Sequence, residues 1–194
     1  MKLALSFIAA LMLAGCAYSD KQTTISPDVQ AAGSSIGKGN EIVLTVQDRR
    51  DDKVFGFRSD AYGNTTVIKT EQDLEALFRN TLGDVFTAKG FSVVSPQQAF
   101  SQNVLTVEIH QIENAAKGNI LTSAVRTKVT VKAIASNGRT NYESSYWAER
   151  DGRNVVTSTG KLTERYINEA ISAVLNNVAN DDELVKLFVS DRME

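Results

Sequence analysis

Cysteine, histidine and proline are nearly absent from this chain, whose 194 residues include one Cys, one His and two Pro. A single cysteine cannot form a disulfide within the chain, and it supplies no thiolate cluster for zinc. An excess of charge of one sign is also absent, because 21 basic residues stand against 23 acidic ones. The chain therefore lacks the positive charge that attracts nucleic acid, and we expect no nucleic-acid partner.

The single cysteine ends an unusual N-terminal segment. Lys2 precedes about ten apolar residues, and Ala14 and Gly15 then lead directly to Cys16. The apolar run is too short to cross a hydrocarbon core of about 30 Å as a helix. The segment resembles a bacterial lipobox, in which the cysteine thiol is alkylated with diacylglycerol. The chain is then cut before the cysteine, and the new amino group is acylated, typically with palmitate.

This resemblance predicts the domain organisation and the location. We expect a signal peptide over residues 1–15, a lipidated Cys16 with a flexible tether over residues 16–40, and one periplasmic domain over residues 41–194. Ala17 stands where an Asp would favour inner-membrane retention, so lipoprotein sorting predicts the periplasmic face of a Gram-negative outer membrane. No later apolar run reaches about 18 residues, so the lipid is the expected membrane attachment. As a coil, the tether would span roughly 25–30 Å.

From Glu41 onward the pattern predicts an α+β domain. The expected elements, in chain order, are a strand over 42–47, a hairpin over 54–69, a helix over 74–86, a strand over 91–94, three strands within 104–149, a helix over 162–178 and a short helix over 182–188. Thr70, three residues before Asp73, suggests a capping box for the first helix. This order predicts a mostly antiparallel mixed sheet with two main helices packed on one face, plus a short C-terminal helix.

Asn137-Gly138 is a strong hairpin signal within the last strands. A two-residue loop would pair Ser136 with Arg139. The register that follows places these residues opposite each other: Arg126 and Glu149, Lys128 and Trp147, Val129 and Tyr146, Lys132 and Glu143. It also puts apolar side chains on one face and charged ones on the other, so we expect one face to be packed and the other to be hydrated.

The sequence offers little for catalysis or metal binding. His110 lies beside Glu108 on the polar side of a strand, and there is neither a G-x-S-x-G nor a P-loop motif. No group of residues has the spacing of metal ligands. We therefore predict a protein that is not an enzyme and that has no cofactor and no metal site.

The predicted hydrated face is the leading candidate for a functional surface. We call it the polar sheet face and define it by Glu108, His110, Lys128, Lys132, Glu143, Trp147 and Glu149. A second candidate is the loop after the first strand, with Asp48, Arg49, Arg50 and Asp51. Trp147 suggests either packing against Lys128 or an anchor for a partner.

Several local patterns occur together in one order. They are Leu13-Ala14-Gly15-Cys16, the helix end from Ala88 to Val94, the Lys117-Gly118-Asn119 break, Asn137-Gly138 and the tail Asn168–Phe188. In this order and spacing the chain resembles YajG-type lipoproteins over residues 41–188. The resemblance implies an uncharacterised lipoprotein of Gram-negative bacteria, and it brings no catalytic residues.

The leading functional prediction is a non-enzymatic interaction module of the cell envelope with an unidentified envelope protein as partner. The alternative is a carrier of lipid or another apolar component, with a cavity lined by Phe55, Phe57, Phe78, Phe86 and Phe91. A third possibility is a cell-wall hydrolase that uses His110.

Overall fold

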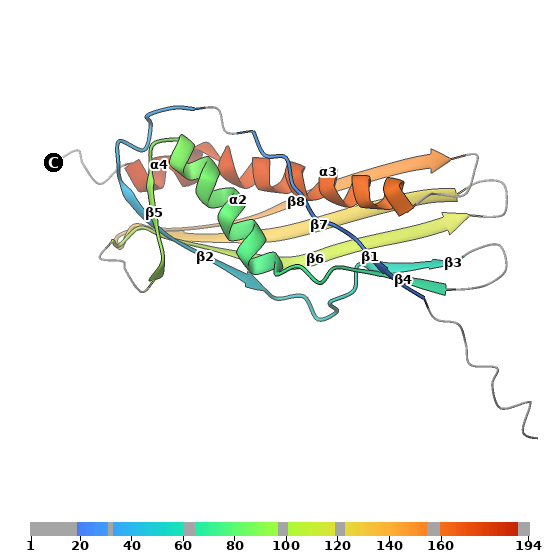
Figure 1. The fold of residues 1–194 in the computed structure, drawn as a ribbon. Coiled ribbons are helices and arrows are strands. Elements are labelled where there is room, and N and C mark those ends of the chain that lie inside the picture. Colours follow the sequence, from blue (N-terminus) through green and yellow to red (C-terminus); the bar gives the residue numbers. More distant parts are fainter. Residues whose placement is uncertain are drawn as a thin grey trace, which may run out of the picture.

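A computed structural model describes residues 19–30, 33–59, 65–96, 101–118, 123–154 and 160–189. The predicted signal peptide, Cys16 and Ala17 lie outside the described residues. Two sheets form the frame of the fold (Figure 1). The larger sheet has the strand order β5 (Ser92–Val94), β2 (Glu41–Asp48), β6 (Val104–Gly118), β7 (Ser123–Ser136) and β8 (Asn141–Asn154).

In the larger sheet, β2 runs parallel to β5 and β6, whereas β6, β7 and β8 are antiparallel. The smaller sheet has the order β1 (Ser19–Gln22), β4 (Thr65–Lys69) and β3 (Gly56–Ser59). Within it, β1 and β4 are parallel, and β3 and β4 form the predicted hairpin. The mixed, mostly antiparallel sheet of the prediction is confirmed.

The helices of the described chain lie on one face of the larger sheet (Figure 1). They are α2 (Leu74–Ala88), α3 (Gly160–Ala179) and the short α4 (Asp182–Val189). This arrangement confirms the predicted α+β class. None of the described helices is both long and apolar enough to cross a membrane.

The predicted capping box at the start of α2 is wrong. Asp73 is the N-cap, and its carboxylate accepts a hydrogen bond from the backbone N–H of Ala76 at 3.0 Å. The Thr70 hydroxyl instead accepts from the N–H of Gln72, two residues later. An acidic cap also suits the positive end of the helix dipole.

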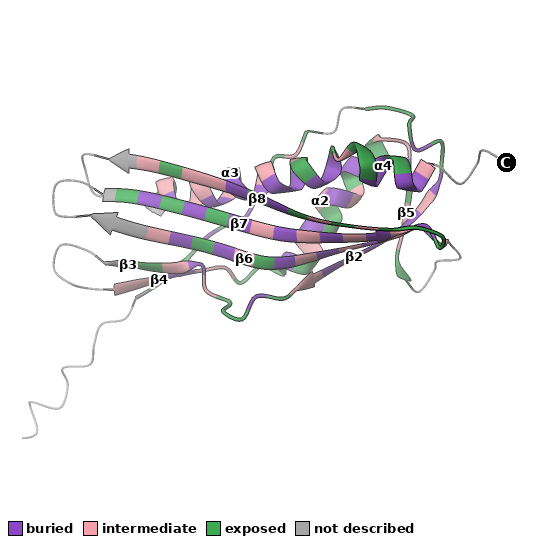
Figure 2. Cartoon of the chain, turned by 180° about the vertical axis from the view of Figure 1, so that it is seen from behind, coloured by how far each residue is buried: buried purple, intermediate pink, exposed green. Residues whose placement is uncertain are grey.

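Burial alternates along β6 and β7, as Figure 2 shows. Val129, Val131 and Ala133 are completely buried beneath the helices, whereas Lys128, which precedes Val129 in the strand, is exposed. Period-two alternation is the physical reason, because successive side chains of a strand point to opposite faces. The predicted division into a packed face and a hydrated face is confirmed.

The predicted register of the β7–β8 hairpin is wrong by two residues. Ser136 pairs with Asn141, not with Arg139, so Lys128 lies opposite Glu149 and Trp147 lies opposite Thr130. The remaining predicted pairs change in the same way, with Arg126 opposite Asp151, Val129 opposite Ala148 and Lys132 opposite Ser145. A shift of two residues leaves every side chain on its predicted face.

The side chain of Asn137 is the cause of the longer turn. Its Oδ1 accepts from the backbone N–H of both Arg139 and Thr140, at 3.0 and 2.8 Å, and its Nδ2 donates to the carbonyl of Leu187 in α4. Gly138 adopts a φ of +83° within the turn. A contact with a helix 50 residues away therefore helps set the loop, which now spans residues 137–140.

The predicted flexible tether over residues 16–40 is wrong for its described part. We call residues 19–30 and 33–40 the N-terminal segment. It begins with β1, and Ile25 is only 1% exposed. The backbone N–H groups of Ser26 and Asp28 donate to Asn168 and Ser172 of α3, at 2.7 and 2.9 Å. These bonds hold the segment against the helices, so the domain begins well before residue 41.

Candidate functional site

All seven residues of the polar sheet face lie on the side of the sheet that the helices leave free. The strand register places Glu108 opposite Lys132 and Lys128 opposite Glu149. Glu143 and Trp147 alternate with residues that point toward the helices, such as the buried Tyr146. The structure therefore brings together on one surface the residues that the sequence suggested.

Ion pairs connect the strands across this surface. Lys132 pairs with Glu143, and Arg126 Nε lies 3.0 Å from Glu149 Oε1. Both pairs were predicted, but they form diagonally because the register differs by two residues. The hydrogen bond with Glu143 raises the pKa of Lys132. These side chains are partly exposed, so each pair contributes little to stability and stays open to a competing partner.

A β-bulge shapes the β2 side of the polar sheet face. The β6–β7 register shifts between Ile109 and Gln111, which places His110 in the irregularity. His110 Nε2 lies 3.0 Å from Glu108 Oε2, and Arg49 Nε lies 3.5 Å from Glu108 Oε1. The hydrogen bond with His110 lowers the pKa of Glu108, although burial opposes that shift.

These contacts decide what His110 can do chemically. Among the described residues its hydrogen-bond partner is a carboxylate, and no hydroxyl group is placed against it as a nucleophile. The described residues also contain no group of three or more His, Cys, Asp or Glu arranged to hold a metal ion. The absence of a catalytic role remains a prediction.

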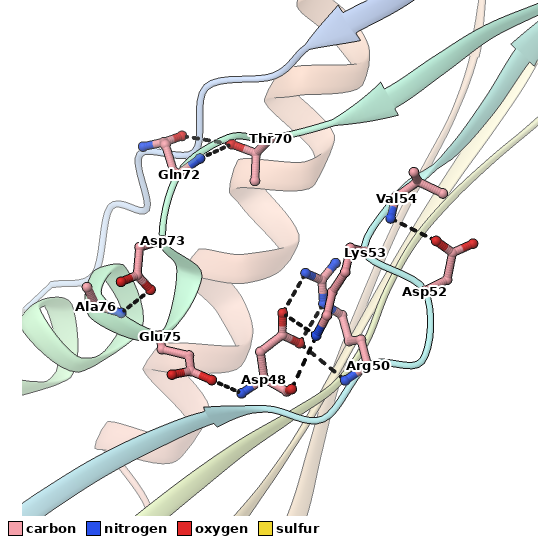
Figure 3. A network of polar contacts seen from close by, with 10 residues as sticks. All are labelled: Asp48, Arg50, Asp52, Lys53, Val54, Thr70, Gln72, Asp73, Glu75 and Ala76. Atoms are coloured by element: carbon pink, nitrogen blue, oxygen red, sulfur yellow. Dashed lines mark hydrogen bonds and ion pairs between the residues drawn. The ribbon is translucent and has the colours of Figure 1, made fainter.

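In the loop after β2, the side chains of Arg50 and Lys53 converge on Asp48 (Figure 3). Arg50 is 7% exposed, and its Nε and Nη2 donate to the two oxygens of Asp48 at 2.9 and 2.8 Å. Lys53 Nζ lies 3.1 Å from the same carboxylate. Arg49 and Asp51 point into solvent instead. Asp48 and Arg50 therefore form a buried fork that fixes the loop.

The fork also joins the sheet to α2. The backbone N–H of Asp48 donates to Glu75 Oε1 in the first turn of α2, at 2.8 Å (Figure 3). The guanidinium of Arg50 lies over the ring of Phe55, with its carbon 5.4 Å from the ring centre. Burial alone would raise the pKa of Asp48, but the hydrogen bonds from Arg50 and Lys53 outweigh it and lower the pKa to about 2.

A groove beside this loop brings together Arg50, Asp51 and His110, which the sequence-based prediction placed on two separate candidate surfaces. It has a volume of about 510 Å³ and lies between residues 50–57 and the part of β6 that follows the bulge. Phe57 is 50% exposed at this groove. Phe55 and Phe57, which the carrier hypothesis places in a cavity, both line this groove.

The phenylalanines of the carrier hypothesis do not line one common cavity. Phe78, Phe86 and Phe91 are core residues, and the rings of Phe86 and Phe91 meet edge to face at 5.9 Å. Phe91 packs in the same way against Phe188 of α4. Ordinary core packing accounts for these three rings.

Trp147 lies at the outer edge of the polar sheet face, on the last strand of the sheet. Its side chain is 64% exposed. Lys128 lies diagonal to Trp147 in the strand register, and the cation–π contacts among the described residues involve Phe55 and Tyr166 instead. The edge beside Trp147 is bordered by three asparagines of α3 and the turn after it, which the sequence-based prediction missed.

Comparison with protein families gives one clear result. A family model described as an uncharacterized lipoprotein matches residues 27–188, which is most of the chain. The match includes part of the N-terminal segment as well as the larger sheet and the helices. Comparison with curated protein sequences gives no match.

Solved structures resemble this chain to different degrees. A protein of Xanthomonas campestris has a TM-score of 0.53 at 13% identity, over 89% of this chain and 96% of its own. A Helicobacter pylori homologue of a neuraminyllactose-binding hemagglutinin has a TM-score of 0.51 at 11% identity, over 85% and 97%. A lipoprotein of Neisseria meningitidis has a TM-score of 0.31 at 18% identity, over 73% and 99%. The first two similarities establish the fold and assign no residue a role.

Proposed function

Because the chain belongs to this family of lipoproteins, we propose that it is anchored by lipid at Cys16 to the periplasmic face of the outer membrane. There it acts as a non-enzymatic interaction module of the cell envelope. The Leu13-Ala14-Gly15-Cys16 sequence and the following Ala17 support the anchor and the membrane. Several acyl chains on one cysteine hold a protein stably, where a single chain would not.

The observation that carries the interaction role is the helix-free polar sheet face. A sheet buried on one side exposes a broad, rigid surface on the other. Here that surface carries positive side chains (Lys128, Lys132) and negative ones (Glu108, Glu143, Glu149) in alternation. A surface with alternating positive and negative charges fixes how a partner with complementary charges is oriented on it. Because the two signs balance, it does not attract polyanions in general.

Attachment to a membrane strengthens this role physically. Two proteins held on the same membrane meet at a high effective concentration, so contacts of modest affinity suffice for association. The exposed ion pairs can exchange partners at low cost, because neither member is fully desolvated. The partner that fits is an envelope protein whose surface also carries charges of both signs.

The anchor is tested by labelling growing cells with a clickable palmitate analogue and separating the membranes on a sucrose gradient. We expect label on the native chain, none on Cys16→Ser, and the labelled protein in outer-membrane fractions. Label-free native protein would contradict the lipid anchor, and labelled protein in inner-membrane fractions would contradict the location.

The partner is tested by crosslinking in living cells and identifying the proteins that purify with the native chain. We expect the double variant Lys128→Glu/Lys132→Glu to lose a reproducible envelope partner. Arg165→Glu is the matched control, since Arg165 is an exposed cation on α3, behind the opposite face of the sheet. Equal loss in both variants, or no partner in the native protein, would overturn the interaction role.

A further inference from the structure

A polar groove runs along the outer edge of β8, where the C-terminal part of α3 and the start of α4 border the sheet. Its volume is about 400 Å³. It is lined by Ser145, Tyr146, Trp147, Asn176, Asn177, Asn180 and Asp181. Aliphatic side chains are missing from this lining, and one residue, Asp181, carries a charge. The composition is that of a site for a neutral, hydrogen-bonding ligand.

The charge of Asp181 is already satisfied within the fold. Its Oδ2 accepts from the hydroxyl groups of Tyr142 and Tyr146, at 2.7 and 2.6 Å. Its Oδ1 caps α4 by accepting from the backbone N–H of Glu183 and Leu184, at 2.9 and 3.0 Å. With both oxygens engaged, Asp181 is a fixed part of the wall and gives no binding point for a cation.

The asparagines provide hydrogen-bonding capacity at fixed positions. Asn176 Nδ2 donates to the backbone carbonyl of Ser172. Asn180 Nδ2 donates to the backbone carbonyl of Asn176, and Asn180 Oδ1 accepts from Lys89 Nζ. Among the described residues, no donor contacts Asn176 Oδ1. Within the part of the chain that the structure describes, the side chain of Asn177 makes no hydrogen bond and is exposed. The groove thus offers two amide acceptors and one complete amide donor group.

Trp147 lines the same groove at the edge of β8, and its exposed indole extends from that edge onto the polar sheet face. We propose that the groove binds a neutral oligosaccharide across the edge of β8, with one pyranose ring stacked on the indole of Trp147 and hydroxyl groups of the adjoining ring bonded to Asn176 and Asn177. The ring C–H groups carry partial positive charge and match the electron-rich indole face. Sugar hydroxyls both donate and accept, as amides do. This site goes beyond the protein partner proposed above and uses none of the charged side chains of the polar sheet face.

A peptide strand added to β8 would use the same edge but needs different neighbours. Strand addition gains specificity from pockets that bury alternate side chains of the added strand. The groove has no aliphatic wall for such pockets, and its free groups are amides. A second copy of this chain paired along β8 would meet the same limitation.

Trp147 is the only tryptophan of the chain, so its fluorescence reports directly on this site. The full-length chain, kept in a detergent without a sugar head group, is titrated with chitotetraose and with maltotetraose. We expect a saturable change of emission with at least one of them in the millimolar range, as suits a shallow site. No saturable change with either sugar would overturn the proposal.

Variants locate the binding. Asn177→Ala removes one free amide from an exposed helix position that tolerates alanine, and we expect binding between about twofold and tenfold weaker. Trp147→Ala should abolish binding, measured by isothermal titration calorimetry, with circular dichroism confirming the fold. The double variant Lys128→Glu/Lys132→Glu is the control and should bind sugar normally, which separates this site from the proposed protein partner.

Two further results would contradict the proposal. One is sugar binding of unchanged strength in both Asn177→Ala and Trp147→Ala, which would place the ligand elsewhere. The other is an emission that depends on protein concentration and not on sugar, which would assign the edge to a second copy of the chain.

Discussion

The Asp48–Arg50 fork and the ion pairs of the polar sheet face contain the same chemical groups in two different environments. The Arg50 side chain is 5% exposed and that of Asp48 13%, whereas Arg126 and Glu149 are 66% and 35% exposed. The fork is bidentate and fixed by the loop, whereas each pair on the sheet joins two long side chains in water. The comparison shows that charges near β2 support the fold, while those on β7 and β8 remain available for binding.

The largest expected effect is the loss of the buried cation. Arg50→Ala leaves the Asp48 carboxylate without its fork, and we expect the free energy of unfolding to fall by about 3 kcal/mol. Urea denaturation measures the change. Arg49→Ala is the matched control, because the adjacent Arg49 is exposed and should cost less than about 0.5 kcal/mol. Equal effects at the two positions would remove the distinction between the two environments.

The second-largest effect is expected at low pH, where protonation of Asp48 weakens its interaction with Arg50. The pKa of Asp48 falls from 3.8 to about 2 on folding, so the unfolded chain binds more protons between these values. The stability that this shift contributes, about 2 kcal/mol, is therefore fully present above the ordinary pKa and lost as the pH falls from about 4 through about 2. Unfolding measured across that range should be less pH-dependent in Asp48→Asn. An unchanged pH profile in that variant would contradict the assignment.

The bond that joins the fork to α2 should matter less. Glu75→Ala removes the acceptor for the Asp48 backbone N–H, and we expect a loss of about 1 kcal/mol in unfolding free energy. Glu75→Gln keeps an acceptor oxygen and should recover part of that loss. If both substitutions cost the same, the hydrogen bond contributes nothing measurable.

The smallest effect is expected on the polar sheet face. Glu149→Gln removes the charge that forms the diagonal ion pair with Arg126, and we expect a change below about 0.5 kcal/mol that vanishes in high salt. Thermal unfolding at low and high ionic strength measures it. A salt-independent loss of more than 1 kcal/mol would mean that this surface, like the fork, supports the fold.

The sequence was sufficient where local periodicity determines the structure. Alternation along residues 104–149 placed Trp147 and Lys128 on the correct face, and the spacing of apolar residues located α2 and α3. The ion pair of Lys132 with Glu143 was also predicted, although its register was not. A register error of two residues changes which side chains of β7 and β8 lie opposite each other, but it does not change the face of the sheet that each side chain occupies.

Contacts between distant segments explain what local patterns missed. Asn137 extends the β7–β8 turn because it also bonds to α4, and residues 23–30 are ordered by side chains of α3 more than 140 positions away. The asparagines beside Trp147 come from α3 and the turn after it, so no motif in the chain joins them. Arg50 lies in a run of charged residues, a pattern that predicts solvent exposure. Its burial results from a tertiary contact with the ring of Phe55, which the local sequence does not indicate.

The N-terminal segment has a consequence for how far the domain stands from its membrane. Because β1 already begins at Ser19, a lipid at Cys16 would be separated from folded structure by only two residues, or about 10 Å of fully extended chain. The smaller sheet would then face the lipid head groups, with α4 and β5 at the far end of the molecule (Figure 1). A short connection of this kind limits tilting, so the polar sheet face would stand beside the membrane at a nearly constant height.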